Sequence, residues 1–187
     1  MARLFVIAIS LVLMGCAGGQ KITDYSKLSV VYGWIDIRDS PGNTLNSFTM
    51  RNLSAPRNER YAVMGWEKMG NGYLVWHNGY PPGRYELDTM QTLTCAGSFV
   101  LCAGNINEYG FGQDGTSPVR TIVNGPGVKF IGCYKFSRTK RGFFRPGEFD
   151  TRKINCGASK RQMLSMMLKS APPEHPIVAE RIRGAMR

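Results

Sequence analysis

The sequence predicts a mainly β fold: an antiparallel β-sandwich with a glycine-rich insertion and C-terminal helices. Twenty-two glycines and ten prolines in 187 residues predict many turns, which favours β structure. Short apolar and aromatic runs between these turns predict strands over residues 28–156. After Cys156, apolar residues recur at helical spacing. A composition of 43% hydrophobic and 20% charged residues is typical of a folded chain.

The first sixteen residues have the pattern of a secretory signal. Arg3 supplies a positive charge, residues 4–14 are apolar, and a small residue, Gly15, precedes Cys16. The apolar run is shorter than the roughly 20 residues that a membrane-spanning helix needs, which speaks against a spanning anchor. The segment Leu13-Met14-Gly15-Cys16 resembles the lipobox of bacterial lipoproteins. This resemblance implies cleavage before Cys16 and acylation of that cysteine.

The same resemblance implies a location. We expect residues 1–15 to be a signal peptide and residues 16–27 to be the lipidated cysteine and a polar, glycine-rich tether. Several acyl chains hold a protein durably on a bilayer. Because Ala17 rather than an aspartate follows Cys16, enterobacteria-like sorting implies the outer membrane, with the domain facing the periplasm. The alternative is an ordinary secretory signal in which Cys16 is incidental.

Residues 28–156 are predicted to form the β-sandwich domain. Turns rich in Gly, Pro, Asn and Asp separate its apolar runs. Residues 51–60 are polar and are expected to form a loop. The expected strands are 28–37, 45–50, 61–66, 73–76, one that starts at Tyr85, and 128–136.

Two turns carry more specific information. Gly70-Asn71-Gly72 predicts a hairpin between its flanking strands. Pro81 and Pro82 exclude a central strand, and Gly83 permits a tight turn into the next one. The turn over residues 80–87 resembles that of transthyretin-like or prealbumin-like β-sandwich modules, with residues 30–37 as the opening strand. This resemblance covers residues 28–90 and implies a role in binding or assembly without shared catalytic residues.

Four cysteines remain if Cys16 is acylated, and an even set outside the cytoplasm predicts two disulfides. Three pairings are possible. We favour Cys95–Cys102, which closes a short loop, and Cys133–Cys156, which ties a strand to the segment before the C-terminal helices. Residues 97–127 are rich in Gly, Asn and Ser and are expected to form a long loop or an irregular edge, either functional or covering a sheet edge.

Residues 157–187 are predicted to be a basic helical segment. A first helix over residues 158–170 would be capped by Ser159, and a second would run from Pro176 to Met186. A stripe at i, i+3, i+4 and i+7 spacing predicts a packed face, although methionine also suits adaptable partner surfaces. The stripe consists of Met163, Met166, Met167 and Ser170.

The positive charge is concentrated in the C-terminal third. Residues 129–187 hold fourteen Lys and Arg against four acids, whereas residues 1–128 hold ten against nine. Outside the cytoplasm, such a surface favours anionic lipid, an acidic envelope polymer or an acidic protein over nucleic acid. The alternative is a basic surface that contacts only solvent. The candidate binding residues are Lys140, Arg141, Arg145, Arg152 and Lys153.

The sequence lacks the common catalytic motifs. It has no G-x-S-x-G elbow, no H-E-x-x-H and no glycine-rich phosphate loop of the G-x-x-x-x-G-K-[ST] kind, so no catalytic residue is assigned. No C-x-x-C pair occurs and His77 and His175 have no ligand-like spacing, so neither a metal nor a cofactor is expected. We expect a lipid-anchored envelope protein with a non-catalytic binding or structural role in an outer-membrane assembly, bound to an envelope protein partner. The alternatives are an adaptor for anionic polymers or lipid and an envelope hydrolase.

Overall fold

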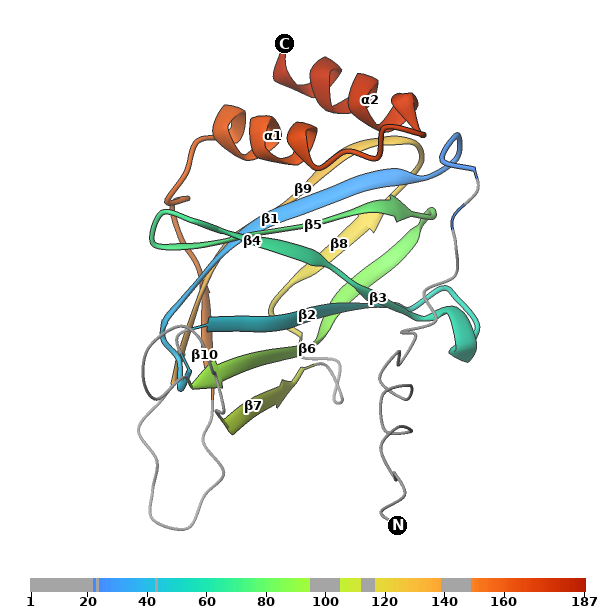
Figure 1. Cartoon of the computed structure of the whole chain (residues 1–187). Coiled ribbons are helices and arrows are strands. Elements are labelled where there is room, and N and C mark those ends of the chain that lie inside the picture. Colours follow the sequence, from blue (N-terminus) through green and yellow to red (C-terminus); the bar gives the residue numbers. More distant parts are fainter. Residues whose placement is uncertain (1–21, 23, 43, 95–104, 112–116, 139–148) are drawn as a thin grey trace, which may run out of the picture.

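A computed structural model describes residues 22, 24–42, 44–94, 105–111, 117–138 and 149–187 (Figure 1). Its main body is two β-sheets with two C-terminal helices, which confirms the predicted fold class. The elements are β1 Ser29–Asp39, β2 Thr44–Asn52, a 3₁₀ turn Arg57–Glu59, β3 Tyr61–Val63, β4 Gly65–Met69, β5 Gly72–Tyr80, β6 Gly83–Thr94, β7 Asn105–Gly110, β8 Arg120–Val123, β9 Gly127–Arg138, β10 Phe149–Lys153, α1 Lys160–Lys169 and α2 Pro176–Met186.

The two sheets are mostly antiparallel. Sheet A has the order β10-β9-β1-β5-β4, and sheet B has the order β3-β2-β6, with β7 and β8 pairing with different parts of β6. The pairing of β1 with β9 is parallel. Strand β1 therefore lies in the centre of sheet A, between β9 and β5.

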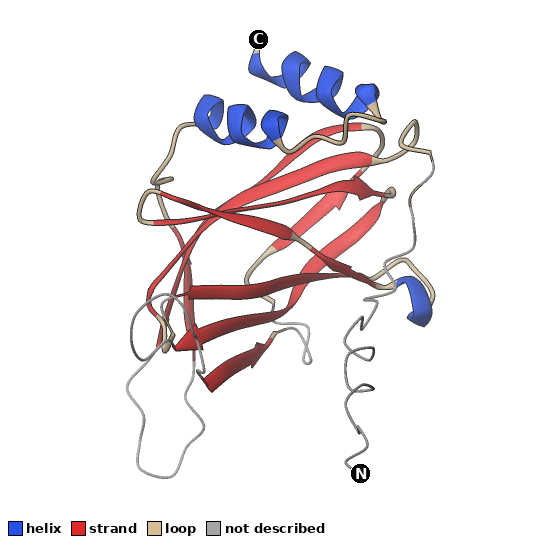
Figure 2. Ribbon diagram, viewed as in Figure 1, coloured by secondary structure: helices blue, strands red, loops and turns tan. Residues whose placement is uncertain are grey.

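The central strand β1 is buried on both faces, so three layers are stacked on one another (Figure 2). Val31 and Ile35 point into the core between the sheets, where they join Phe48 and Phe136. Trp34, on the opposite face, packs in a second core beneath the helices. Sheet A is thus covered by sheet B on one face and by α1 and α2 on the other.

The helices form where the spacing of apolar residues predicts them. Ser159 caps α1 by accepting the Gln162 backbone N–H, while the Gln162 side chain accepts the N–H of Ser159. Met163 and Met167 are buried against sheet A and Met166 packs there in part, so the methionines of the stripe form a packed face as predicted, whereas Ser170 is exposed. Pro176 is the first residue of α2, as expected.

The expected strand over residues 61–66 is wrong in one respect, because it is two strands in different sheets. Met64 is buried, and its N–H donates to the Phe48 carbonyl at 2.8 Å. On either side of it, β3 pairs with β2 in sheet B and β4 pairs with β5 in sheet A. The predicted hairpin around Gly70 is confirmed as β4–β5, and Gly70 has the positive φ of 60° that such a turn requires.

The expectation for residues 97–127 is right in part, because β7 forms an edge of sheet B, but the region is not a single long loop. The described parts of this region contain β7 and β8, which pair with β6 along the edge that β2 leaves open. An open edge offers unpaired backbone groups, and these order β7, whose polar sequence has little strand propensity of its own. Strand β10 in the basic region was not predicted either.

A disulfide joins Cys133 in β9 to Cys156, which confirms the second of the two favoured pairings. Cys95 and Cys102 lie outside the described residues. The bridge attaches the segment before α1 to sheet A, and Cys133 is buried in the core beneath the helices. It therefore ties the helical layer to the sheet that it covers.

Loss of this disulfide is expected to lower the free energy of unfolding by about 3 kcal/mol, the value for closing a loop of this length, whose ends are 23 residues apart. The measurement is urea unfolding with and without reductant in a Cys95→Ala/Cys102→Ala background, which removes the other two thiols of the domain. Reductant should have no effect once Cys133→Ala and Cys156→Ala are added. Equal sensitivity to reductant with and without these two changes would contradict the prediction.

Candidate binding groove

The structure describes two of the five basic residues proposed from sequence. Arg152 and Lys153 are exposed on β10, the strand at one edge of sheet A. Lys140, Arg141 and Arg145 lie outside the described residues. Lys153 lines a small depression of about 230 Å³ beside the Cys133–Cys156 bridge. Neither Arg152 nor Lys153 lines a larger groove that other elements form.

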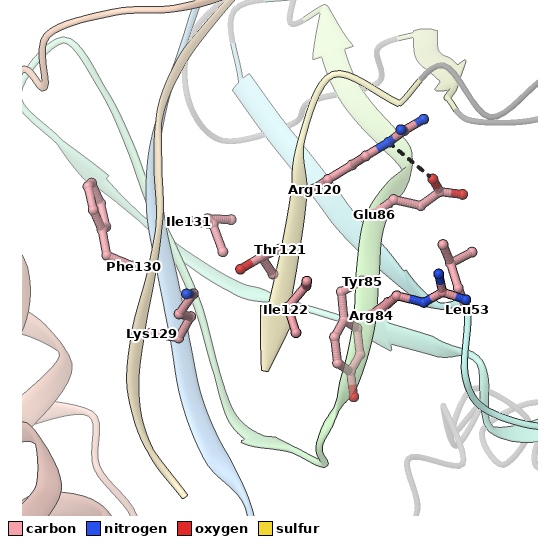
Figure 3. Close-up of a pocket in the computed structure, with 10 residues that line it drawn as sticks. All are labelled: Leu53, Arg84, Tyr85, Glu86, Arg120, Thr121, Ile122, Lys129, Phe130 and Ile131. Carbon is pink, nitrogen blue, oxygen red and sulfur yellow. Dashed lines mark ion pairs between the residues drawn. The ribbon is translucent and has the colours of Figure 1, made fainter. Parts of the chain in front are cut away.

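That groove lies where the chain passes from sheet B to sheet A, between β8 and β9 (Figure 3). It is an open depression of about 840 Å³. Strands β6, β8 and β9 and the end of β2 supply its walls. The lining residues are Leu53, Arg84, Tyr85, Glu86, Arg120, Thr121, Ile122, Lys129, Phe130 and Ile131.

Positive charge dominates the groove. Arg84, Arg120 and Lys129 line it with exposed side chains, whereas Glu86 is the one acid among its lining residues and is only 3% exposed. Arg51 binds the Glu86 carboxylate at 2.5 Å, and Arg120 lies 3.7 Å from it. Because Glu86 is already paired with these cations, the exposed rim is cationic.

Apolar side chains are exposed beside these charges. Ile122 is 55% exposed and Leu53 is 40% exposed. Phe130 points to the other side of β9, where its ring stacks against Tyr32 at a centroid distance of 5.0 Å (Figure 3). The groove thus combines a cationic rim with exposed aliphatic surface.

Sequence reasoning missed the groove because its residues come from distant segments. The β-branched run Thr121-Ile122-Val123 was a strand signal, but it lay in a region interpreted as a loop. Arg84 and Arg120 become neighbours only because β8 pairs with the start of β6.

The two histidines have structural contacts. Nδ1 of His77 accepts the Gly79 backbone N–H at 3.0 Å, and its ring packs edge-on against Tyr80. Burial lowers the pKa of His77, which favours the neutral ring. His175 stacks on Tyr25 at 4.5 Å. Neither residue lines the groove.

Comparisons with protein-family models, with curated proteins and with solved structures found no match to this chain. Within the described ranges, no helix is long and apolar enough to cross a membrane. No group of three or more His, Cys, Asp or Glu side chains placed to hold a metal occurs in the same part of the chain.

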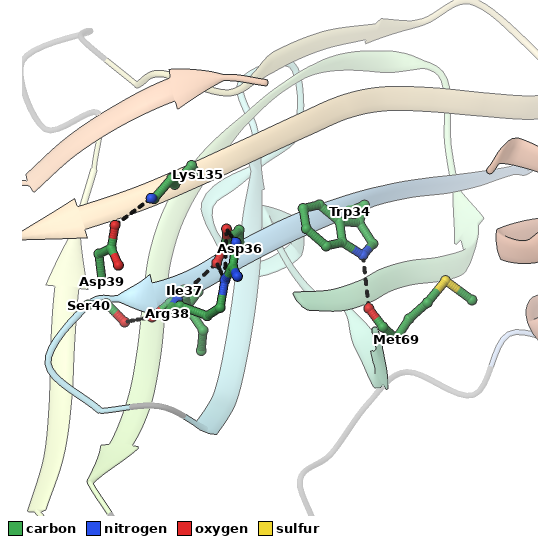
Figure 4. Close-up of polar contacts among 8 residues, drawn as sticks. All are labelled: Trp34, Asp36, Ile37, Arg38, Asp39, Ser40, Met69 and Lys135. Carbon is green, nitrogen blue, oxygen red and sulfur yellow. Dashed lines mark hydrogen bonds and ion pairs between the residues drawn. The ribbon is translucent and has the colours of Figure 1, made fainter. Parts of the chain in front are cut away.

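A charged cluster lies on β1, on the face of sheet A that the helices cover (Figure 4). The Asp36 carboxylate is buried and accepts hydrogen bonds from Nε and Nη2 of Arg38, at 3.0 and 2.7 Å. These bonds hold the pKa of Asp36 below its usual value, although burial opposes them. Lys135 in β9 forms an ion pair with the neighbouring Asp39.

The lowered pKa of Asp36 predicts a contribution to acid sensitivity. The ionised Asp36 carboxylate stabilises the folded state. This contribution is complete above the unfolded-state pKa of about 3.9 and is lost as pH falls through the lower folded-state pKa. Because Arg38 is more than half exposed, Asp36→Asn should lower the free energy of unfolding by only about 1 kcal/mol at neutral pH. Between about pH 5 and pH 2, the free energy of unfolding of the variant should depend less on pH than that of the wild type. Urea unfolding across this range measures the effect. An Asp36→Asn profile parallel to that of the wild type would contradict it, and Asp39→Asn serves as the matched control.

Arg181 joins α2 to the chain that leads into β1. Its guanidinium donates to the carbonyl oxygens of Tyr25 and Ser26, each at 2.7 Å, and to that of Leu28 at 2.5 Å. Tyr25 also stacks on His175, just before α2. The start of the domain is therefore held against the helical layer.

Proposed function

We propose that this protein is a lipid-anchored cell-envelope protein with a non-catalytic binding role. The groove between β8 and β9 would be its binding surface. The observation that carries the proposal is the lipobox-like segment Leu13-Met14-Gly15-Cys16 and the short polar tether after it. The cationic, partly apolar groove supports the binding role. Ala17 supports sorting to the outer membrane, with the domain facing the periplasm.

The length of the tether limits where the domain can lie. Residues 16–24 span at most about 30 Å when fully extended. Arg181 holds residues 25–28 against α2, so an acylated Cys16 would keep the helical layer within about this distance of the bilayer. The proposed anchor therefore also restricts the orientation of the domain.

The test is intact mass and membrane fractionation of the native protein beside Cys16→Ser and Ala17→Asp. The wild type should lose its first fifteen residues, gain acyl mass and fractionate with the outer membrane. Cys16→Ser should gain no acyl mass and leave the membrane fraction. Ala17→Asp is the matched control: it should keep the acyl mass, and in an enterobacterial host it should change only the membrane in which the protein is found. Unchanged mass and location for Cys16→Ser would overturn the anchor.

A second candidate function is an adaptor for anionic lipid or envelope polymers through the basic C-terminal third. Exposed basic residues on the helical layer favour it, since residues 157–187 hold six Lys and Arg against two acids. Arg152 and Lys153 add exposed charge on β10. Co-sedimentation with phosphatidylglycerol vesicles tests this function. Binding that survives both Arg152→Glu/Lys153→Glu and high salt would contradict an electrostatic contact.

A further inference from the structure

We propose that β8 is a docking edge for an extended, acidic segment of a partner protein, which would join sheet B as a further strand. The proposal rests on the binding role proposed above and specifies its partner. It does not depend on the lipid anchor. Strand addition of this kind derives affinity from backbone hydrogen bonds and specificity from alternate side chains.

The backbone of β8 has an open edge in the described part of the chain, where β8 pairs with β6 alone. Ile122 lies opposite Arg84 in the pairing of β8 with β6. The Arg84 carbonyl accepts the Leu53 N–H, and the Arg84 N–H donates to the Ser54 hydroxyl. Both bonds lie on the side of β6 that faces away from β8. In an antiparallel ladder such a residue pair is not hydrogen-bonded. The N–H and C=O of Ile122 therefore point away from β6, toward the position that a new strand would occupy.

The surroundings of this edge select for negative charge. Arg84, Arg120 and Lys129 are exposed around it, while Glu86, the one acid of the groove lining, is buried against Arg51. Complementary charges across an interface favour the correct partner and repel others. An acidic segment is therefore matched to the groove, and a basic one is repelled.

Alternation along β8 defines the side chains of the partner further. Thr121 and Val123 are buried, whereas Arg120 and Ile122 are exposed on the outer face. Because opposite residues in paired strands share a face, an added strand would place an acid near Arg120 and an apolar residue near Ile122. A second copy of β8 fits less well, since it would bring Arg120 toward another cationic rim.

The test is fluorescence anisotropy of a labelled hexapeptide, Thr-Glu-Thr-Val-Thr-Glu, added to the detergent-purified full-length protein. Its Glu and Val side chains share one face of an extended strand, so a Glu and the Val can lie opposite Arg120 and Ile122. The charge control is Thr-Lys-Thr-Val-Thr-Lys. Ile122→Pro removes the outward N–H without touching the pairing with β6, and proline is tolerated at such edge positions. Ile122→Val keeps the N–H and is the matched control. Arg84→Glu/Lys129→Glu tests the charge.

We expect the acidic peptide to bind, and its affinity to fall about tenfold or more with Ile122→Pro and with Arg84→Glu/Lys129→Glu. Ile122→Val should bind like the wild type, and the basic peptide should not bind. An acidic peptide methylated on alternate backbone nitrogens should also fail, which keeps the test decisive if Ile122→Pro does not fold. Absence of binding, unchanged affinity of the methylated peptide, or a protein dimer abolished by Ile122→Pro would overturn the proposal. None of these outcomes would alter the acyl mass that tests the anchor.

Discussion

Replacing Trp34 by alanine is expected to lower the free energy of unfolding by about 3–5 kcal/mol, the range for removing a fully buried aromatic side chain. Trp34 is 2% exposed and fills the space between sheet A and the helical layer. A Cβ on Gly72 or Gly157 would lie 2.4 or 2.5 Å from its ring, so the backbone is closely fitted around it. The indole N–H also donates to the Met69 carbonyl at 3.3 Å (Figure 4).

Urea unfolding measures this effect, and Trp66→Ala is the matched control. Trp66 also donates its indole N–H to a backbone carbonyl, that of Asn46 at 3.1 Å, but it is 38% exposed. Its loss should cost about 1 kcal/mol, because it empties little buried volume. Similar losses for the two variants would show that the core beneath the helices does not depend on Trp34.

Replacing Glu86 by alanine is expected to cost about 3 kcal/mol or more, because it leaves a largely buried cation without its main partner. Glu86 is buried on the outer face of sheet B, bound to Arg51 at 2.5 Å. Arg51 is itself only 19% exposed and keeps Asp88, at 3.4 Å, as its remaining neighbouring acid. The hydrogen bond with Glu86 raises the pKa of Arg51, which favours its charged form.

The double variant Arg51→Met/Glu86→Leu separates charge burial from packing. A buried ion pair replaced by apolar residues of similar size is often no less stable than the original. The double variant should therefore recover most of the stability lost in Glu86→Ala, as measured by urea unfolding. A double variant as unstable as the single one would mean that the pair contributes specific stabilising contacts beyond mutual neutralisation.

The local elements of this fold could be predicted from the sequence, because their signals are local. The cap at Ser159, the proline at position 176 and the glycine turn at residues 70–72 each act within a few residues. Strand β7 could not be predicted in the same way. Its short, polar sequence is ordered by the edge of β6, which comes into place only in the folded chain.

The candidate site illustrates the same limit. The basic residues proposed from sequence lie within fourteen positions of one another in the chain, and the two that the structure describes lie on β10 and do not line the groove between β8 and β9. Arg84, Arg120 and Lys129 are spread over more than forty positions and converge through strand pairing. Counting charges along the sequence thus identified the basic C-terminal third of the chain. It could not identify a cationic groove whose residues come from separate strands.

The parallel pairing of β1 with β9 has a consequence for the way the chain is made. Tyr32 in β1 pairs with Phe130 in β9, which lies 98 positions later in the chain. A ribosome needs about 5–20 s to synthesise that length. During this interval the apolar, aggregation-prone strand at residues 29–37 lacks one of its two neighbours and the helices that cover it. The newly made chain is therefore expected to be a client of chaperones until its C-terminal third has emerged.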